Sequence, residues 1–293
     1  MSAVATRPAS VAGRSSRKPA RKPRGPIVWL REHIIQILAF FAFVYLLLPN
    51  VVVIIFSFNE PRGRYNLTFE QFSLNAWLHP CGAPGICSSV GLSLRIGFLA
   101  TLFATLLGTM IAFALVRHRF PGRSSSNLLI FMPMATPEVV MGSSLLTLFV
   151  GPLHVIPLGF QTILIAHIMF CISFVVVTVK ARLAGLDPRL EEAAMDLYAN
   201  EWETLRRITL PLVAPGIAAA ALLSFSLSFD DYIITSFNAS PATQTFPMYV
   251  WGASTRGTPV QINVIGTIMF FVSLACVGVA QYVAFRRSRA RAS

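Results

Sequence analysis

Residues 191–211 read EEAAMDLYANEWETLRRITLP and hold five of the chain's twelve acidic residues. The rest of the 293-residue chain is apolar and basic: 55% of all residues are hydrophobic, only 12% are charged, and the formal net charge is +12. A water-soluble domain carries about 25% charged residues, so this chain lacks the charges needed to cover a water-facing surface. The composition therefore predicts an integral membrane protein, with the charged stretch in a loop outside the bilayer.

Six apolar segments are long enough to cross a bilayer as helices, for which about 20 residues are needed. They are residues 34–56, 90–116, 127–150, 160–179, 212–237 and 262–285. The fifth is interrupted by Asp230 and Asp231. The sequence thus predicts an all-α integral membrane protein with six transmembrane helices. We expect one domain over residues 32–287, flanked by tails at 1–31 and 288–293.

The lysines and arginines gather on one side of these spans. Eight lie within residues 1–32, three follow the second span, five follow the fourth span, and four lie at the C-terminus. The other side has only Arg62, Arg64 and Arg256, while Arg95 lies inside the second span. Because cytoplasmic loops carry the excess of basic residues, both termini and the loop 180–211 are expected in the cytoplasm. This placement favours a multi-pass membrane protein over a protein that binds nucleic acid.

The N-terminal tail is basic, and its first 26 residues include no acidic residue and almost no large apolar one. We expect residues 1–31 to be disordered, with anionic membrane lipid as their partner. The apolar run that follows is too long for a secretory signal and lacks a small-residue cleavage site, which predicts an uncleaved first span.

The four cysteines and the histidines do not form a metal-ligand pattern, and the sequence has no HExxH and no Walker A motif. No metal, cofactor or catalytic residue is therefore predicted. Cys81 and Cys87 lie in the loop between the first two spans, outside the cytoplasm, where a disulfide can form. Spacing alone leaves that bond open. Cys171 and Cys276 lie within spans and are expected to be buried packing residues.

Two short amphipathic helices are predicted in the charged loop. Asp187 followed by Pro188 is a favourable helix start, combining an N-cap acceptor with proline at the first position. An apolar stripe follows at helical spacing, formed by Leu190, Ala193, Ala194 and Leu197. Asn200 and Glu203 fit a capping box that opens the second helix, which Pro211 is expected to end. From the pattern alone, packing against the chain's own bundle or lipid and docking to a partner remain equally open.

The run Glu192-Ala193-Ala194, followed by Ile208-Thr209-Leu210-Pro211, resembles the EAA loop of ABC-importer permease subunits. In that family the loop is a coupling helix that inserts into a cleft of the cytoplasmic ATPase. The resemblance implies these coupling residues: Glu191, Glu192, Ala193, Ala194, Asp196, Leu197, Tyr198 and Ala199. The family usually has glycine at the position of Tyr198, where glycine permits positive φ. We expect the bend to be displaced to Asn200, which tolerates unusual turn geometry.

Three further runs resemble the second permease subunit of spermidine/putrescine-type importers. They are Gly108-Thr109 with Ala112-Phe113-Ala114-Leu115, Pro137-Glu138-Val139-Val140, and Phe229-Asp230-Asp231-Tyr232-Ile233-Ile234-Thr235. The resemblance covers about residues 30–287 and implies the architecture of a type I importer permease. It also implies three kinds of partner: a second similar permease, two ATPase subunits and an external substrate-binding protein. ATP and Mg would be bound by the ATPase and not by this chain.

Ionisable residues within spans are costly and tend to mark transport pathways. Arg95 and Glu138 are predicted either to form a buried ion pair or to leave Glu138 free for cargo. If the fifth helix continues to Phe237, Asp230 and Asp231 both lie at membrane depth about 100° apart, so that at most one faces the path. If the helix ends before them, both acids are solvated.

The predicted substrate path consists of Glu138, Asp230, Asp231, Tyr232 and Trp251. Carboxylates and aromatic faces can hold a multivalent cation such as a polyamine, although interfacial belts alone would explain the aromatic residues. Two alternatives stay open. One is the same architecture importing thiamine, ferric iron or an opine. The other is an ion-coupled secondary transporter, which inverted repeats would favour.

Overall fold

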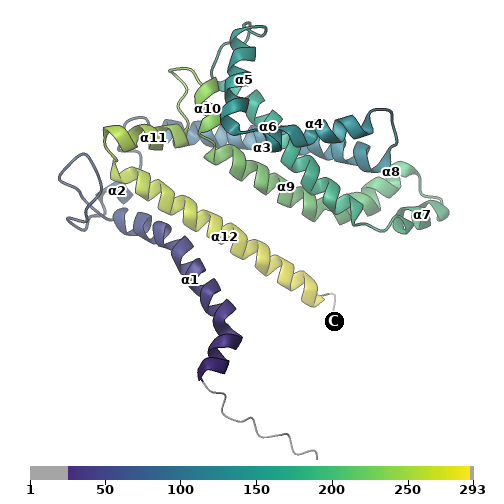
Figure 1. Ribbon diagram of the computed structural model, residues 1–293, viewed down its shortest axis with the longest axis horizontal. Helices are drawn as coiled ribbons and strands as arrows, with labels where there is room; N and C mark the ends of the chain where they lie inside the picture. The colour runs from purple at the N-terminus through teal and green to yellow at the C-terminus, as the bar shows by residue number, and fades with distance from the viewer. Residues whose placement is uncertain (1–25, 291–293) are drawn as a thin grey trace, which may run out of the picture. The chain divides into compact units, whose positions relative to one another are not determined.

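The computed structural model describes the backbone of residues 26–290, and side chains over 33–279 and at Tyr282. The helices are α1 (Pro26–Phe56), α2 (Asn75–Leu78), α3 (Ile86–Arg117), α4 (Arg123–Ala135), α5 (Glu138–Val150), α6 (Phe160–Ala184), α7 (Arg189–Asp196), α8 (Glu201–Thr204), the π-helical turn η1 (Leu205–Thr209), α9 (Leu210–Asp230), α10 (Ile233–Asn238), α11 (Phe246–Arg256) and α12 (Val260–Ala290) (Figure 1). No strand occurs in the described part, which confirms the all-α prediction. Residues 1–25 and 291–293, on which most of the predicted tails fall, lie outside it.

The chain divides into two units, residues 1–51 and 52–293. In the first, the described residues form the larger part of α1. Within the described residues, five helices are long and apolar enough to cross a membrane: His33–Phe56, Ile86–Arg117, Phe160–Ala184, Glu201–Asp230 and Val260–Val279. A sixth span arises if the bent pair α4 and α5 is counted as one. The six predicted spans are therefore reached only if this bent pair is counted as one broken span.

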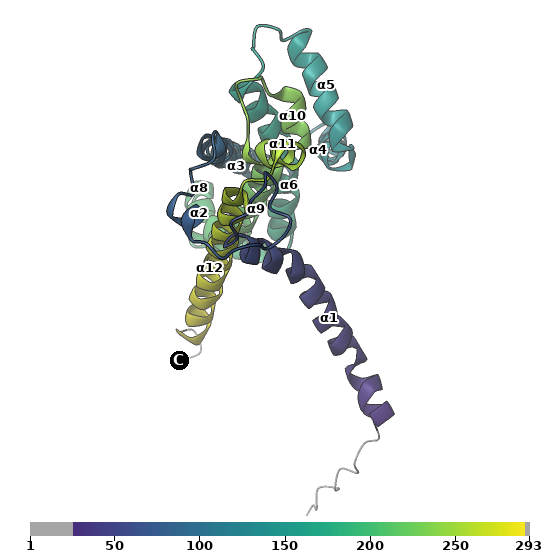
Figure 2. The same ribbon diagram turned by 90° about the vertical axis from the view of Figure 1, so that its left-hand side faces the viewer.

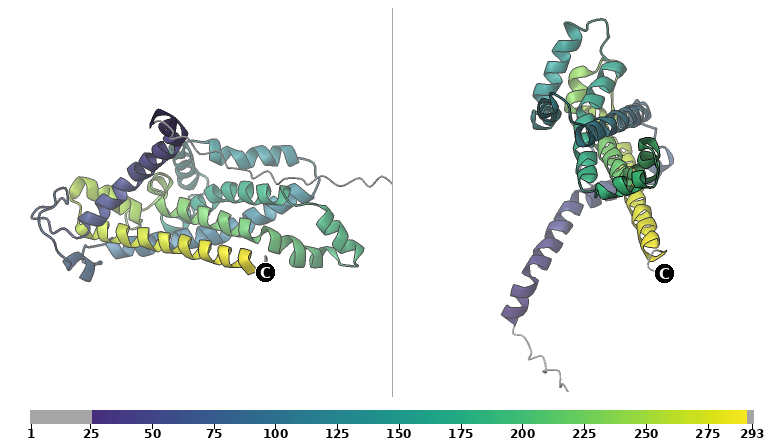
Figure 3. Two further views of the ribbon diagram at one scale, coloured as in Figure 1. Left: turned by 90° about the horizontal axis from the view of Figure 1, so that it is seen from below. Right: turned by 90° about the vertical axis from the view of Figure 1, so that its right-hand side faces the viewer.

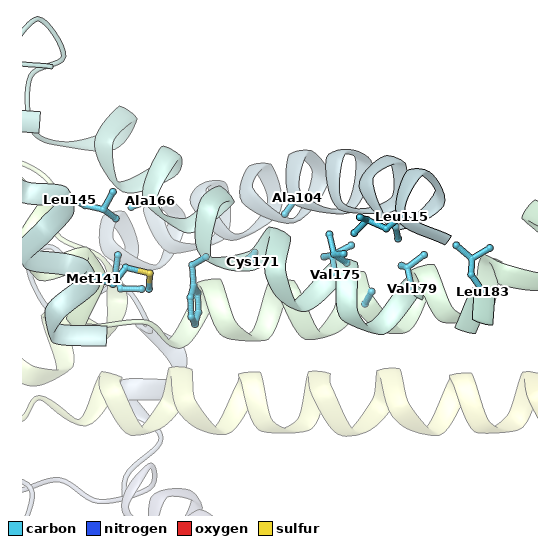
Figure 4. Close-up of a cluster of buried hydrophobic side chains, with 14 of the residues drawn as sticks. Ala104, Leu115, Met141, Leu145, Ala166, Cys171, Val175, Val179 and Leu183 are labelled. Carbon is cyan, nitrogen blue, oxygen red and sulfur yellow. The ribbon is translucent and has the colours of Figure 1, made fainter. Parts of the chain in front are cut away.

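Three long helices of the second unit, α3, α6 and α9, pack side by side and enclose its main core (Figures 1 and 3). Small residues allow the close approach: a Cβ added to Gly108 of α3 would lie 2.7 Å from Cγ1 of Val175 on α6. Such small-residue contacts are typical of helix pairs in membranes. Figure 4 shows the buried cluster between the helices, including Ala104, Leu115, Ala166, Cys171, Val175, Val179 and Leu183.

The third predicted span, residues 127–150, is not one helix. It consists of α4 and α5, which meet at an angle of 108°. The break falls at Thr136 and Pro137: the residue before a proline is driven out of the helical region, and Thr136 has extended backbone with ψ 132°. Glu138 therefore begins α5 instead of lying within one continuous span over residues 127–150.

The fifth predicted span, residues 212–237, is also broken. Helix α9 ends at Asp230, the backbone is extended at Asp231 (ψ 124°), and α10 starts at Ile233. The segments after the two breaks, α5 and α10, pack together (Figure 2), and a Cβ on Gly142 of α5 would lie 2.8 Å from the ring of Phe237. Both predictions for the end of this span are wrong. The helix does not continue to Phe237, and Asp231 is buried instead of solvated.

The loop after α1 is fixed by hydrogen bonds and by a disulfide. Nδ2 of Asn59 donates to Oδ1 of Asn66 over 2.6 Å, and backbone N–H of Asn66 donates to the Thr258 hydroxyl before α12. Cys81 and Cys87 are bonded, which settles the question that spacing left open. Cys171 is buried as predicted, whereas Cys276 is exposed on this chain, so its predicted burial is wrong.

Candidate functional site: a broken helix and an exposed loop

Asp231 lies in the break between α9 and α10 and is buried, with 9% of its surface exposed. Its carboxylate accepts hydrogen bonds from the backbone N–H of Ile234 (3.3 Å) and Thr235 (2.8 Å), and from the Thr235 hydroxyl (2.8 Å). It therefore caps the start of α10, where the first N–H groups have no partner within the helix. This capping explains why the chain stops being helical at this acid.

His167 of α6 completes the buried network. Its Nδ1 lies 2.7 Å from Oγ of Ser228 on α9, and its Nε2 lies 2.9 Å from the Thr235 hydroxyl and 3.3 Å from Oδ2 of Asp231. The ring is 2% exposed. No role for His167 was predicted from the sequence, where the histidines form no metal-ligand pattern. A signal was present, because an ionisable residue inside an otherwise apolar span calls for a partner.

Asp230, the neighbouring acid, is exposed at the last position of α9. Beyond the break, the rings of Tyr232 and Trp251 stack with centroids 5.1 Å apart, and the Trp251 side chain is 62% exposed. Of the two predicted path acids in this span, only Asp230 is thus free to meet a cargo. The predicted aromatic residues do contact one another.

Glu138 and Arg95 do not form the predicted ion pair in the described part of the chain. Glu138 is exposed in the first turn of α5. Arg95 is exposed on α3 and lines a polar cavity of about 540 Å³ together with Ser88, Thr243 and Gln244. The interpretation of the two residues as a buried pair is therefore wrong, whereas the role of Glu138 in the path stays a prediction.

The charged loop forms the two short helices predicted for it, α7 and α8. The capping box is present: the Asn200 side chain accepts from the N–H of Glu203 (2.8 Å), and the Glu203 carboxylate accepts from the N–H of Asn200 (3.3 Å). Oδ1 of Asp187 accepts from the N–H of Arg189, where α7 begins, one residue later than expected. Figure 1 shows both helices at one end of the α3–α6–α9 bundle.

The predicted stop at Pro211 is wrong, because α8 continues through η1 into α9. Pro211 lies in the first turn of α9, directly after the π-helical turn, where the N–H of Leu210 bonds to the carbonyl of Leu205. The wider π turn changes the hydrogen-bond register just upstream of the proline, which lacks the N–H that an uninterrupted α-helix would need.

Tyr198 makes the bend between the helices. Its φ is +67°, and it is the single non-glycine residue with positive φ in the described part of the chain. Asn200 has an ordinary φ of −78°. The expected displacement of the bend to Asn200 is therefore wrong: the tyrosine adopts the conformation for which glycine is favoured.

The apolar stripe of α7 faces mostly outward. Ala194 is buried (6% exposed), but Leu190 is 46% exposed, Leu197 81% and Tyr198 97%. Ala193 and the acidic residues Glu192 and Asp196 are exposed as well, and Ala199 is half-buried. The exposed apolar and acidic side chains form what we call the α7 surface. It consists of Leu190, Glu192, Ala193, Met195, Asp196, Leu197, Tyr198 and Trp202.

Among the three acidic residues predicted to take part in coupling, Glu191 alone is not exposed. Its carboxylate is 2.7 Å from Nη2 of Arg117, the last residue of α3, and its side chain is only 21% exposed. The Thr209 hydroxyl at the end of η1 donates to the same oxygen, also over 2.7 Å. The structure therefore turns Glu191 toward the bundle, not toward the α7 surface.

Comparison with known proteins identifies the family. Residues 104–290 match the family described as "Binding-protein-dependent transport system inner membrane component". The chain is 37% identical over 242 residues to the spermidine/putrescine transport system permease protein PotC of Escherichia coli K12, which covers 83% of this chain and 90% of PotC. It is 36% identical over 265 residues to the putrescine transport system permease protein PotI of the same organism, with 89% and 92% covered.

Solved structures share the fold at low sequence identity. A bacterial alginate ABC transporter, crystallised in complex with an alginate pentasaccharide-bound periplasmic protein, matches with a TM-score of 0.66 at 17% identity over 88% of this chain and 94% of that chain. An amino acid ABC transporter crystallised with histidines matches with a TM-score of 0.53 at 19% identity over 74% and 100%. The chain therefore belongs to the binding-protein-dependent ABC importer permeases, and it is a multi-pass component of the inner membrane.

Proposed function

We propose that this permease carries polyamines of the spermidine and putrescine class. The observation that supports this cargo best is the identity of 36–37% to relatives named for spermidine and putrescine transport, over more than four fifths of the chain. The exposed Asp230 agrees with it, since a carboxylate attracts a polyamine cation. The stacked rings of Tyr232 and Trp251 add aromatic faces that can hold an ammonium group.

We further propose that the α7 surface docks to an ATPase subunit on the cytoplasmic side, with both termini on that side. Its exposed tyrosine, tryptophan and methionine side chains suit a protein partner, because interfaces are enriched in aromatic residues and methionine. In this proposal the importer also contains a second similar permease, a second ATPase subunit and an external binding protein. ATP and Mg are bound by the ATPases, and this chain supplies path and coupling but no catalytic residue.

In this assembly the transport cycle runs by alternating access. Closure of the ATPases moves α7 and opens the path to the outside, where the binding protein delivers the cargo. Asp230 and the Tyr232–Trp251 pair would then meet the cation as it enters. Release of ADP lets the permeases return to the inward-facing state.

The cargo is tested by uptake of radiolabelled spermidine and putrescine into cells that express the assembled importer and lack other polyamine uptake. We expect uptake that unlabelled polyamine inhibits and that thiamine, ferric iron and opines do not. Uptake inhibited by one of those solutes instead would reject the polyamine assignment while leaving the architecture intact.

The orientation is tested by labelling a cysteine introduced at Glu201 of α8 with a membrane-impermeant maleimide. We expect labelling in inside-out vesicles and none in intact cells. Labelling of intact cells from outside would overturn the cytoplasmic placement of α7 and α8, and with it the proposed docking.

A further inference from the structure

A three-residue contact connects α7 to the bundle. One carboxylate oxygen of Glu191 binds Nη2 of Arg117, at the end of α3, and accepts from the hydroxyl of Thr209, at the end of η1. Both distances are 2.7 Å, within the range of strong charge-assisted hydrogen bonds. The side chains of Glu191 and Arg117 are 21% and 25% exposed, so solvent screens the pair less than a surface ion pair. We call Arg117, Glu191 and Thr209 the brace.

The next residue, Glu192, has a different environment. Successive helix positions point about 100° apart, so adjacent glutamates cannot both face the bundle. Glu192 is exposed, and its side chain forms no hydrogen bond or ion pair with the part of the chain that the structure describes. The two glutamates therefore divide between the two sides of α7, one directed at the bundle and one at the α7 surface.

The position of the brace makes it more than a local contact. The backbone of α7 lies close mainly to that of α8 and η1, which follow α7 in sequence. Glu191 adds a contact to Arg117, 74 positions away in sequence and at the end of a 32-residue helix. Its bond to Thr209 reaches the residue directly before α9. The end of α3 and the π-helical turn that leads into α9 thus both contact α7 at a single carboxylate.

We propose that Glu191 acts as a positioning residue that transmits movement of α7 to α3 and α9. This inference rests on the proposed docking of the α7 surface to an ATPase. Without the brace, α7 would still present the same surface and bind its partner. Its displacement would be absorbed at the Tyr198 bend and would move the two long helices less.

The test compares docking with coupling in the assembled importer. Docking is measured as the amount of ATPase that copurifies with the permeases, and coupling as spermidine transported per ATP hydrolysed in proteoliposomes. Glu191→Gln and Arg117→Gln should each leave copurification unchanged and lower the transport ratio severalfold. The double reversal Arg117→Glu with Glu191→Arg should restore much of that ratio, because it re-forms the ion pair. Arg119→Gln, which removes an exposed arginine two residues from Arg117, should change neither measurement.

Three outcomes would overturn the proposal. First, the amount of copurifying ATPase could fall as far in Glu191→Gln as in Glu192→Lys, a variant that changes the α7 surface. That result would make Glu191 a docking contact. Second, the single variants could keep the full transport ratio. Third, the double reversal Arg117→Glu with Glu191→Arg could assemble as a monodisperse importer and still transport no more spermidine per ATP than the single variants. Failure of the docking proposal itself would be seen separately, as normal copurification and uptake in both Glu192→Lys and Leu197→Asp.

Discussion

At the scale of the residue, the two adjacent acids of the α9–α10 break have different surroundings. Asp231 is buried and its oxygens are occupied by Ile234, Thr235 and His167, whereas Asp230 is exposed at the helix end. A carboxylate that already accepts several hydrogen bonds has little capacity left for a cargo. We therefore propose Asp230 for contact with the cargo, whereas the hydrogen bonds of Asp231 give it a structural role.

Asp230→Asn keeps the shape of the side chain and removes its charge. Loss of one charge-assisted contact costs about 1.5–3 kcal/mol, or roughly ten- to a hundredfold in affinity. We expect the KM for spermidine uptake to rise by about that factor while the importer assembles normally. The measurement is initial uptake rate against spermidine concentration. Glu60→Gln, which neutralises an exposed acid in the loop after α1, is the matched control, and an equal rise in both variants would contradict the assignment.

Tyr198→Gly should stabilise the protein. The left-handed conformation costs a non-glycine residue about 1–2 kcal/mol, and glycine removes this strain. Glycine also loses more conformational entropy on folding, which offsets about 0.5–1 kcal/mol of the stabilisation. The expected net effect is a rise in the Tm of the detergent-solubilised protein by a few degrees at most. Tyr198→Ala keeps the Cβ and hence the strain, so it should show no rise. Equal stabilisation by both variants would mean that removal of the exposed ring, and not relief of φ, is responsible.

At the scale of the element, the two broken helices were the features that the sequence predicted least well. Their apolar residues were recognised, but hydropathy averages over a segment and does not detect a local change of backbone direction. The Thr136-Pro137 pair signalled the first break by a local steric rule. The second depends on Asp231, which caps α10 locally, and on His167, 64 positions earlier on another helix. Contact between Asp231 and His167 could not be predicted from a local pattern.

Replacement of His167 tests whether the second break is held from α6. His167→Leu leaves Asp231, Ser228 and the Thr235 hydroxyl without their shared partner, and unsatisfied buried polar groups cost about 1–3 kcal/mol. We expect a lower Tm and a lower yield of folded protein in detergent. His118→Leu, at an exposed histidine after α3, should have little effect. A Tm unchanged by His167→Leu would show that Asp231 fixes the break without it.

The close approach of α3 and α6 gives a second test at this scale. A Cβ at Gly108 would lie 2.7 and 2.8 Å from Cγ1 and Cβ of Val175, so Gly108→Ala must push the helices apart or distort the valine. Gly91→Ala on the same helix meets nothing within 4 Å and gains helix propensity, about 1 kcal/mol. We expect the first variant to lower the Tm and the second to leave it unchanged or raise it. The same shift in both would contradict the packing argument.

At the scale of the whole molecule, length, apolar periodicity and the EAA-like run were sufficient to predict an all-α membrane permease and its family. These features are local or cumulative, so they can be read along the chain. What could not be predicted is which side chains meet across helices: the brace, the His167 network and the absence of an Arg95–Glu138 pair. Such contacts depend on helix rotation and on where each span bends.

The break at Asp231 also has a consequence for the local electrostatic field. A helix carries partial negative charge at its C-terminal end and partial positive charge at its N-terminal end. Asp230 adds a carboxylate to the negative end of α9, while Asp231 places its carboxylate on the positive end of α10 and compensates it. The final carbonyl groups of α9 therefore attract a cation together with Asp230. Some affinity for polycations should accordingly persist when Asp230 is neutralised, because the backbone dipole of α9 remains.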